Sequence, residues 1–437
     1  MRVSLKNPNR LEGVVNPPGD KSISHRAVLF NSIAYGRSRI ANFSSGDDCT
    51  STLRCLRALG VSLRRVSKED DSRPVLVVSG LKERSLKEPQ KILDAGNSGT
   101  TMRFLTGLLA AQPFFSVITG DHSLRSRPMH RELEPLGLMG AHIRGRQGNS
   151  RAPLAIEGMP LRGIEYTMPE PSAQLKSTLL LAGLFSEGET RLHQPAASRD
   201  HSERLLREMG AQLMVDGLSL HLMPGRLNAI DITIPADLSS AAFWVIAGVC
   251  HPSASLIIQG VGVNPTRAGI LEVLKIMGAN IKLENQRNEG GEPVADILAE
   301  SSELVGVEIS GDMIPLLIDE IPVIALAACF ARGDTIIRNA ESLRVKETDR
   351  IQTTVKELTA LGADIEELPD GMVIHGKGKL HGSYTRSHGD HRLAMTLGIA
   401  GLLAEGSTDV WDAQVSSISY PSFWEDMRRV APAMVTH

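Results

Sequence analysis

The feature that most constrains the fold of this chain is an internal repeat that recurs along its 437 residues. Five segments combine the end of an amphipathic helix, a glycine and an extended stretch: "LRALGVSL", "LGLMGAHI", "LLREMGAQL", "VLKIMGANI" and "ELTALGADI". Their glycines are spaced roughly 70–85 residues apart, a period typical of repeated supersecondary units. Each is predicted to end a helix in a left-handed cap: Gly60, Gly140, Gly210, Gly278 and Gly362.

A second phrase recurs six times, and each copy predicts an apolar helix followed by a short strand. The six helical copies are "SHRAVLFNSIAYG", "GTTMRFLTGLLAA", "SAQLKSTLLLAGLF", "LSSAAFWVIAGVC", "DEIPVIALAACFARG" and "DHRLAMTLGIAGLLAEG". Helices that are apolar on all sides are buried inside a domain. The sixth unit lacks the capping glycine, and "FWEDMRRVAP" near the C-terminus is predicted to take the place of its outer helix.

These repeats predict six α/β subdomains, grouped as two domains of three, because a chain of this length exceeds one ordinary core. A solenoid is the alternative, although the units are longer than most solenoid repeats. We place the boundary near "IPADLSS" and expect the first residues to pack with the second half. The predicted domains are residues 20–235, and residues 1–19 together with 236–437.

Composition argues against several classes of protein. Aromatic residues are 4% of the chain and the formal net charge is -3, so neither stacking platforms for single-stranded nucleic acid nor a global field for polyanions is expected. The four cysteines form no CxxC pair, and we expect buried, reduced thiols. The N-terminus has no secretory h-region and no apolar run spans a bilayer. We expect a soluble cytoplasmic protein.

Each predicted buried helix begins with a polar cluster: "GDKSISHR", "GNSGTTMR", "SAQLK", "DLSS", "IDE" and "GDHR". Helix N-termini favour anions, and one capping side chain per helix would satisfy them. Capping alone accounts for "DLSS" but leaves unexplained the cations at four positions, which oppose the helix dipole. We expect each of them to be matched by a bound anion: Lys21, Arg26, Lys176 and Arg392.

Three further basic clusters point the same way: "DHSLRSRPMHRE", "SRDHSER" and "LRVKETDRI". If the last is helical, Lys346 and Arg350 lie one turn apart, with Glu347 beside Arg350. A solvated, salt-bridged face would explain any one cluster, but their number in a chain without net positive charge favours small anionic substrates. A P-loop, a GxGxxG after a strand and metal-ligand spacing are all absent from the sequence, so we expect no metal.

Seven motifs in order resemble the 5-enolpyruvylshikimate-3-phosphate synthases: "GDKSISHR", "LDAGNSGTTMR", "SLRSRPM", "SAQLKS", "IDEIPV", "LRVKETDRI" and "GDHRLAM". The resemblance covers about residues 10–425. It implies a two-domain, inside-out α/β barrel in which each domain has three βαβαββ-type subdomains around buried helices, with substrates in the interdomain cleft. It also implies a monomer that transfers the enolpyruvyl group of phosphoenolpyruvate to the 5-hydroxyl of shikimate 3-phosphate through a tetrahedral ketal, without cofactors.

The resemblance also implies which residues bind the substrates. For shikimate 3-phosphate they are Lys21, Ser22, Arg26, Ser172, Ala173, Gln174, Arg199, Asp319 and Lys346. For phosphoenolpyruvate they are Lys21, Asn97, Gly99, Arg127, Gln174, Arg350 and Arg392, with Arg125 as an alternative to Arg127. Asp319 and Glu347 would be base and acid, and the other catalytic candidates are Lys21, Lys346 and His391.

Two rival functions remain. The sister enzymes that use UDP-N-acetylglucosamine usually carry a cysteine in the region of "GDHSLRSRPM", and this stretch has none. A non-catalytic phosphate- or RNA-end-binding protein would have little use for paired acids such as Asp319 and Glu347. "SAQLK", "RDHSE" and "NPTR" resemble the second class of the synthases, which is associated with glyphosate tolerance, so tolerance is a further hypothesis.

Overall fold

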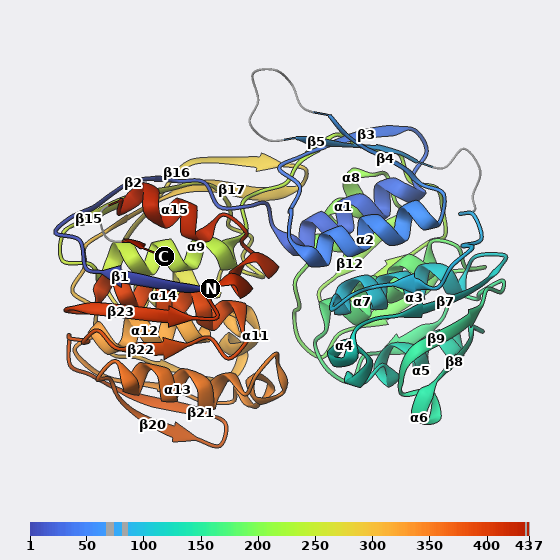
Figure 1. Ribbon diagram of the computed structural model, residues 1–437. Helices are drawn as coiled ribbons and strands as arrows, with labels where there is room; N and C mark the ends of the chain where they lie inside the picture. Colours follow the sequence, from blue (N-terminus) through green and yellow to red (C-terminus); the bar gives the residue numbers. More distant parts are fainter. Residues whose placement is uncertain (67–73, 81–85, 433–434, 437) are drawn as a thin grey trace. The chain divides into compact units, whose positions relative to one another are not determined.

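The computed structural model describes residues 1–66, 74–80, 86–432 and 435–436. The chain forms two compact units, coloured along the sequence in Figure 1. The first unit consists of Gly19–Ile234 with Glu289–Glu292, and the second unit consists of Met1–Pro18, Pro235–Asn288 and Pro293–His437. Both units are mixed α/β structures, as the repeats predicted, and each has its own apolar core.

Three buried helices form the centre of the first unit: α1 (Lys21–Ile33), α3 (Gly99–Ala110) and α7 (Ala173–Gly183). Helix α3 packs against both α1 and α7. Their apolar residues on all sides explain this position, since no face is suited to water. The remaining helices of the unit are α2 (Asp47–Ala58), α4 (His122–Ser126), α5 (His130–Leu138), α6 (Arg146–Asn149) and α8 (His201–Glu208).

Three four-stranded sheets complete the first unit, and each has one parallel pair followed by two antiparallel pairs. The first is β14 (Ile232–Thr233), β3 (Arg37–Ala41), β5 (Val75–Ser79) and β4 (Ser62–Val66). The second is β6 (Leu93–Asp94), β7 (Phe115–Thr119), β9 (Arg151–Glu157) and β8 (His142–Gly145). The third is β10 (Glu165–Thr167), β11 (Thr190–His193), β13 (Ser219–Leu222) and β12 (Leu213–Asp216).

The second unit repeats this plan around α9 (Leu238–Cys250), α12 (Ile321–Phe330) and α14 (His391–Leu403), which pack against one another (Figure 1). Its outer helices are α10 (Gly269–Ile276), α13 (Arg350–Ala360) and α15 (Phe423–Val430). Helix α15 takes the place predicted for the sixth outer helix. Short helical turns are η1 (Gly311–Met313), α11 (Ile314–Leu317), η2 (Glu341–Val345) and η3 (Ala413–Ile418).

The chain start supplies strands to two sheets of the second unit. Strand β2 (Leu11–Val15) pairs in parallel with β15 (Ala254–Gly262), in the sheet that also contains β16 (Asn280–Glu289) and β17 (Glu292–Glu300). Strand β1 (Arg2–Lys6) lies between β23 (Ser407–Trp411) and β24 (Val435–Thr436), and β22 (Tyr384–Arg386) pairs with the other side of β23. The third sheet is β18 (Glu308–Ile309), β19 (Gly333–Ile337), β21 (Gly371–Gly376) and β20 (Asp364–Leu368).

The five predicted glycine caps are confirmed. Each glycine has a φ between 83° and 95°, in the left-handed region that favours a residue without Cβ. The amide after each glycine donates to a carbonyl five residues back, as Val61 N does to Leu56 O, which completes a Schellman motif. These caps end the amphipathic helix of five repeats at the same point, so the strand that follows enters its sheet in the same direction each time.

The four cysteines are all free thiols, and three of them, Cys49, Cys55 and Cys329, are buried. Among the described residues, no single helix is both long and apolar enough to cross a membrane; only Gly311–Leu317 and Ile321–Phe330 counted together reach that length and composition, and they are bent by 109°.

Candidate active site

The residues predicted to bind or transform substrates fall into two groups, one in each unit, and nearly all lie at or just before a helix start. In the first unit, Asp20 caps α1 by accepting from Ile23 N at 2.8 Å. This cap places Lys21 and Ser22 in the first turn. Lys21 Nζ donates to Asp48 Oδ2 of α2 at 3.1 Å. The α1 start therefore carries a cation whose position is set by a carboxylate on the next helix.

Arg26 is a buried cross-link as well as a predicted ligand. Its Nε donates to Ser202 Oγ at 2.7 Å and its Nη1 to Ser22 O at 3.0 Å. Its Nη2 reaches Ser177 Oγ at 2.9 Å and Ala173 O at 3.4 Å. These four bonds engage four of the five N–H donors of a guanidinium. Burial lowers the pKa of Arg26 to about 10, so the side chain stays charged at neutral pH.

The start of α3 brings together Asn97, Gly99 and Arg127. Ser98 caps the helix by accepting from Thr101 N at 3.1 Å. Arg127 Nη2 donates to Asn97 Oδ1 at 3.1 Å. A Cβ built on Gly99 would lie 3.6 Å from Arg127 Nη1, whereas Arg125 on α4 bonds back to Asp121 O. Of Arg125 and Arg127, Arg127 is therefore the one beside Gly99, where Arg103 Nη1 also lies, 2.6 Å from the same Cβ.

The start of α7 carries Ser172, Ala173 and Gln174. Ser172 caps the helix through a bond from Leu175 N at 3.3 Å, and Gln174 Nε2 donates to Thr100 Oγ1 at 2.9 Å. Arg199 lies in the segment that joins β11 to α8. The Arg26 bonds to Ala173 O and Ser202 Oγ thus tie α1 to the start of α7 and to the first turn of α8, which follows the segment that carries Arg199.

One expectation about this group is wrong. Lys176 was expected to be matched by a bound anion, but its anion is Glu203 of α8, with Nζ 2.5 Å from Oε1. Both side chains are buried. The sequence pattern could not show this, because Glu203 lies on another helix and becomes a neighbour only after folding.

The second group is centred on Arg350, at the start of α13. Its Nε donates to Asp390 Oδ2 at 2.7 Å, its Nη1 to Asp319 Oδ1 at 3.4 Å and its Nη2 to Glu347 Oε2 at 2.6 Å. The side chain is 2% exposed. Burial opposes the charge, but the three carboxylates outweigh it and raise the pKa of Arg350. The guanidinium therefore holds both predicted catalytic acids on neighbouring nitrogens.

Arg392, in the first turn of α14, lies beside a second acid pair. Its Nη2 is 3.7 Å from Asp319 Oδ2 and its Nη1 is 3.8 Å from Glu320 Oε1. Glu320 is buried and accepts from both terminal nitrogens of Arg267, at 2.8 and 2.9 Å, and from Ser239 Oγ at 2.5 Å. This network joins the starts of α9, α12 and α14. Arg267 neutralises Glu320, so the nearby Arg392 is not needed for that purpose.

The sequence left open whether residues 343–351 form one helix, and the structure shows that they do not. The 3-10 turn η2 ends at Val345, Lys346 has an extended backbone with ψ of -151°, and α13 begins only at Arg350. Asp349 causes the new start, since its side chain accepts from Gln352 N at 3.0 Å. Glu347 and Arg350 still meet, as predicted. His391, the remaining catalytic candidate, is the buried first residue of α14.

Four acids of the site were not predicted as functional: Asp48, Glu203, Glu320 and Asp390. Each pairs with a basic residue of the site and so sets its position. Burial raises the pKa of Asp390, but Arg350 outweighs burial and the net effect is a lowered pKa. Asp390 and Glu320 belong to the helix-start clusters "GDHR" and "IDE", so the sequence did indicate that they lie near the site. Asp48 had none.

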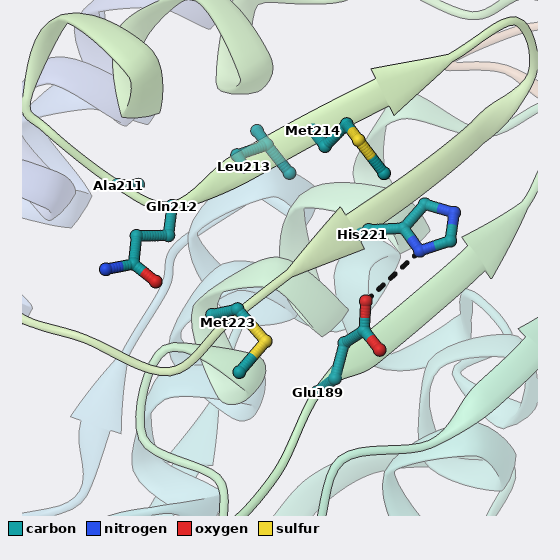
Figure 2. A pocket seen from close by; sticks show the side chains of 7 residues that line it. All are labelled: Glu189, Ala211, Gln212, Leu213, Met214, His221 and Met223. Carbon is teal, nitrogen blue, oxygen red and sulfur yellow. Dashed lines mark hydrogen bonds and ion pairs between the residues drawn. The ribbon is translucent and has the colours of Figure 1, made fainter.

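A metal centre has no support in the part of the chain that the structure describes, where no group of three or more His, Cys, Asp or Glu residues could hold an ion. The lining of a hollow in the first unit includes no predicted site residue. Figure 2 shows its lining, in which His221 Nδ1 and Glu189 Oε1 lie 3.1 Å apart: Glu189, Ala211, Gln212, Leu213, Met214, His221 and Met223.

The two groups offer complementary chemistry. The first unit supplies cations and helix N-termini with a backbone approach at Gly99, which suits phosphate and carboxylate groups. The second unit supplies two guanidiniums beside two carboxylates, Asp319 and Glu347, which suits proton transfer next to an anionic reactant. A reaction that moves protons on doubly anionic substrates fits both groups.

Comparison with known proteins identifies the family. The profile described as EPSP synthase (3-phosphoshikimate 1-carboxyvinyltransferase) matches residues 5–427. The 3-phosphoshikimate 1-carboxyvinyltransferase of Roseiflexus castenholzii is 52% identical over 97% of this chain and 98% of its own. That of Herpetosiphon aurantiacus is 49% identical over 99% of this chain and 100% of its own.

Solved structures agree. The EPSP synthase of Acinetobacter baumannii superposes with a TM-score of 0.91 and 40% identity, and all of both chains is covered. The enolpyruvyl transferase NikO from Streptomyces tendae shares the fold, with a TM-score of 0.79 at 21% identity over 100% of this chain and 98% of its own. The seven motifs, the six repeats and the two groups of charged residues therefore have one explanation: the chain belongs to the EPSP synthase family.

Proposed function

We propose that this protein transfers the enolpyruvyl group of phosphoenolpyruvate to the 5-hydroxyl of shikimate 3-phosphate and releases phosphate, as 3-phosphoshikimate 1-carboxyvinyltransferases do in the shikimate pathway. The observation that carries the proposal is the arrangement around Arg350, whose terminal nitrogens hold Asp319 at 3.4 Å and Glu347 at 2.6 Å. Two carboxylates beside a buried cation can move two protons, while the cation compensates the negative charge of the substrate.

The first step adds the 5-hydroxyl oxygen to the central carbon of phosphoenolpyruvate. The hydroxyl loses its proton to Asp319, and the methylene gains a proton from Glu347, which gives a tetrahedral ketal with a methyl group. In the second step the ketal expels phosphate, which takes the proton held by Asp319, and the methyl group returns a proton to Glu347, so the enol double bond forms again on the new ether. Each carboxylate ends as it began, and Lys346 and Lys21 would compensate charge on oxygen.

The binding roles follow the two residue groups. Lys21, Ser22, Arg26, Ser172, Ala173, Gln174 and Arg199 would hold shikimate 3-phosphate together with Asp319 and Lys346. Asn97, Gly99, Arg127, Arg350 and Arg392 would hold phosphoenolpyruvate together with Lys21 and Gln174. Since these sets draw on both units, the proposal requires the two groups to act on one pair of substrates. Arg26 has one donor left over from its protein bonds, so it would contribute a single bond to the ligand.

The proposal includes a cytoplasmic monomer that works without metal or organic cofactor. Activity should persist in excess chelator, and light scattering should give the mass of one 47.2 kDa chain. Glyphosate tolerance is part of the same proposal, and inhibition at low glyphosate in the presence of competing phosphoenolpyruvate would contradict it.

The test measures phosphate release from phosphoenolpyruvate with shikimate 3-phosphate, with UDP-N-acetylglucosamine or with neither. We expect release only with shikimate 3-phosphate, and a loss of about 10³-fold or more in Asp319→Asn, because a proton acceptor at the reacting oxygen is removed. Asp312→Asn is the control, since Asp312 is an exposed carboxylate seven residues earlier in the chain. Release with the UDP-sugar would move the protein to the sister activity, and no release at all would favour an anion-binding protein.

A further inference from the structure

The ammonium group of Lys176 lies in the interior of the first unit, where a charge is costly. The side chain is 1% exposed, and its neighbours along α7 include buried Leu175 and Leu179. Desolvation lowers the pKa of Lys176 more than Glu203 raises it. A buried ion pair is weak support for stability, because apolar side chains of similar volume often serve as well. A lysine at this position therefore calls for a role other than packing.

Three contacts show what the ammonium holds. Nζ lies 2.5 Å from Glu203 Oε1 on α8, and it donates to Gln194 Oε1 at 3.1 Å and to Ser198 O at 3.4 Å. Ser198 Oγ also donates to Gln194 Oε1, at 2.5 Å. The segment 194–200, which joins β11 to α8, is thus fixed at its beginning and near its end by one side chain of α7.

Arg199 follows directly after Ser198, whose carbonyl oxygen Lys176 binds. On the other side of Arg199, helix α8 is fixed through Glu203 by Lys176 and through Ser202 by Arg26. Ser177, next to Lys176 on α7, bonds to the same Ser202 hydroxyl at 2.6 Å. The backbone that carries Arg199 is consequently tied to the first turn of α7 from both directions.

The pair does not satisfy all of its polar atoms. Glu203 Oε2 is buried and has no hydrogen-bond partner among the described residues. An unsatisfied buried oxygen destabilises the folded state, so this arrangement is not the most stable one available. It does keep a fixed distance between two parts of the predicted shikimate 3-phosphate set, the α7 start (Ser172–Gln174) and Arg199.

We infer that Lys176 is a positioning residue for shikimate 3-phosphate: its ammonium fixes segment 194–200 so that Arg199 and the α7 start meet the same ligand. The inference rests on the proposed function, since it takes shikimate 3-phosphate as the ligand of these groups. Lys176 touches neither substrate in this scheme and acts only through the segment and through Glu203. Loss of the Lys176 ammonium should weaken the binding of shikimate 3-phosphate and leave the binding of phosphoenolpyruvate nearly unchanged.

The experiment compares the wild type with Lys176→Met, Arg199→Ala and the double variant. Lys176→Met should raise the KM for shikimate 3-phosphate about 10-fold and change the KM for phosphoenolpyruvate less than about 2-fold. In the Lys176→Met background, Arg199→Ala should cost less than about 2-fold more, because coupled residues are not additive. Leu179→Ala, one turn further along α7, is the control for a destabilised helix without polar contacts.

The outcomes separate the possible failures. Equal changes in both KM values, or additive effects of Lys176→Met and Arg199→Ala, would overturn the inference while the enzyme activity stands. The same KM pattern in Leu179→Ala would overturn it too, since general loosening would then suffice. A wild type without activity on shikimate 3-phosphate would instead contradict the proposed function. If Lys176→Met does not fold, Glu203→Gln takes its place, because it removes the charge and keeps the side-chain shape.

Discussion

Arg350 and Asp390 form a buried ion pair, with Nε 2.7 Å from Oδ2, at the point where the starts of α13 and α14 meet. Asp390 also caps α14 by accepting from Arg392 N at 2.8 Å. One carboxylate therefore orients two arginines of the proposed phosphoenolpyruvate set, one through a side-chain bond and the other through a backbone bond. Asp390 therefore fixes the position of the Arg350 guanidinium relative to the start of α14.

Asp390→Asn is expected to be strongly destabilising even though asparagine can still cap the helix. The substitution leaves the buried Arg350 without its fully buried partner, and breaking such a pair costs roughly 3–5 kcal/mol. Urea unfolding should show the loss in the free energy of unfolding. Asp349→Asn is the matched control, since Asp349 caps α13 but its pair with Arg344 is partly exposed, so about 1 kcal/mol or less is expected. Equal losses of unfolding free energy in the two variants would contradict the conclusion that Asp390 stabilises the buried Arg350.

Gly99→Ala is expected to weaken the binding of phosphoenolpyruvate more than the binding of shikimate 3-phosphate. The new Cβ would lie 2.6 Å from Arg103 Nη1, and Arg103 cannot retreat easily because its Nε bonds to buried Glu132 at 2.8 Å. Displacement of Arg103 or Arg127 should raise the KM for phosphoenolpyruvate several-fold, measured by steady-state kinetics. Gly137→Ala is the control, since nothing lies within 4 Å of its Cβ in α5. It should stabilise the protein by roughly 0.5–1 kcal/mol without changing either KM.

The repeats and helix ends could be predicted because their causes are local. A glycine after an amphipathic helix forms a Schellman cap wherever it occurs, and a helix that is apolar on all sides has to be buried. The choice of partner strand for the start of the chain is a different case. That Leu11 pairs with Ala254 follows from contacts between distant segments, which no pattern within either segment reports.

The candidate site divides in the same way. Polar residues at helix starts were visible in the sequence, since N-cap residues and arginines next to them form short motifs. The pairing of these residues with acids on other helices was not visible in the sequence. Asp48 holds Lys21 and Glu203 holds Lys176 from other helices, so the anion that seemed to be missing at Lys176 belongs to the protein itself. At Lys346 the sequence left open whether a helix continues, and the Asp349 cap decides it, because this cap starts α13 only at Arg350.

The stability of the protein should fall as the pH decreases from about 6.5, and His25 should account for part of the loss. Burial lowers the pKa of His25 to about 3, and the smaller effects of Asp48, Lys21 and Arg26 do not reverse this. Its Nδ1 bonds to Thr52 Oγ1 at 2.7 Å, and Nε2 has no partner within the described part of the chain. Below pH 6.5 the unfolded chain binds a proton that the folded chain does not, so folding becomes less favourable.

At pH 5 the contribution of His25 should be about 2 kcal/mol smaller than at pH 8, from the difference between an unfolded pKa near 6.5 and the sample pH. Urea midpoints at the two pH values measure the change. In His25→Gln this part of the dependence should vanish, whatever the variant costs at pH 8. His375→Gln is the control at a partly exposed histidine whose pKa is raised, chiefly by Asp334, and it should not flatten the profile. An unchanged profile in His25→Gln would show that the folded state accepts the proton.

The four thiols should react slowly with a disulfide reagent such as dithionitrobenzoate while the protein is folded. Burial raises the pKa of Cys55 and Cys329 to about 12, and it raises the pKa of Cys49 and Cys250 as well. Since the thiolate is the reacting form, reaction at pH 8 should require opening of the structure. All four thiols should titrate at once in denaturant. Ligands that stabilise the folded state should slow the native reaction further. More than one fast thiol that ignores both substrates would contradict the burial of Cys49, Cys55 and Cys329, since only Cys250 is partly exposed.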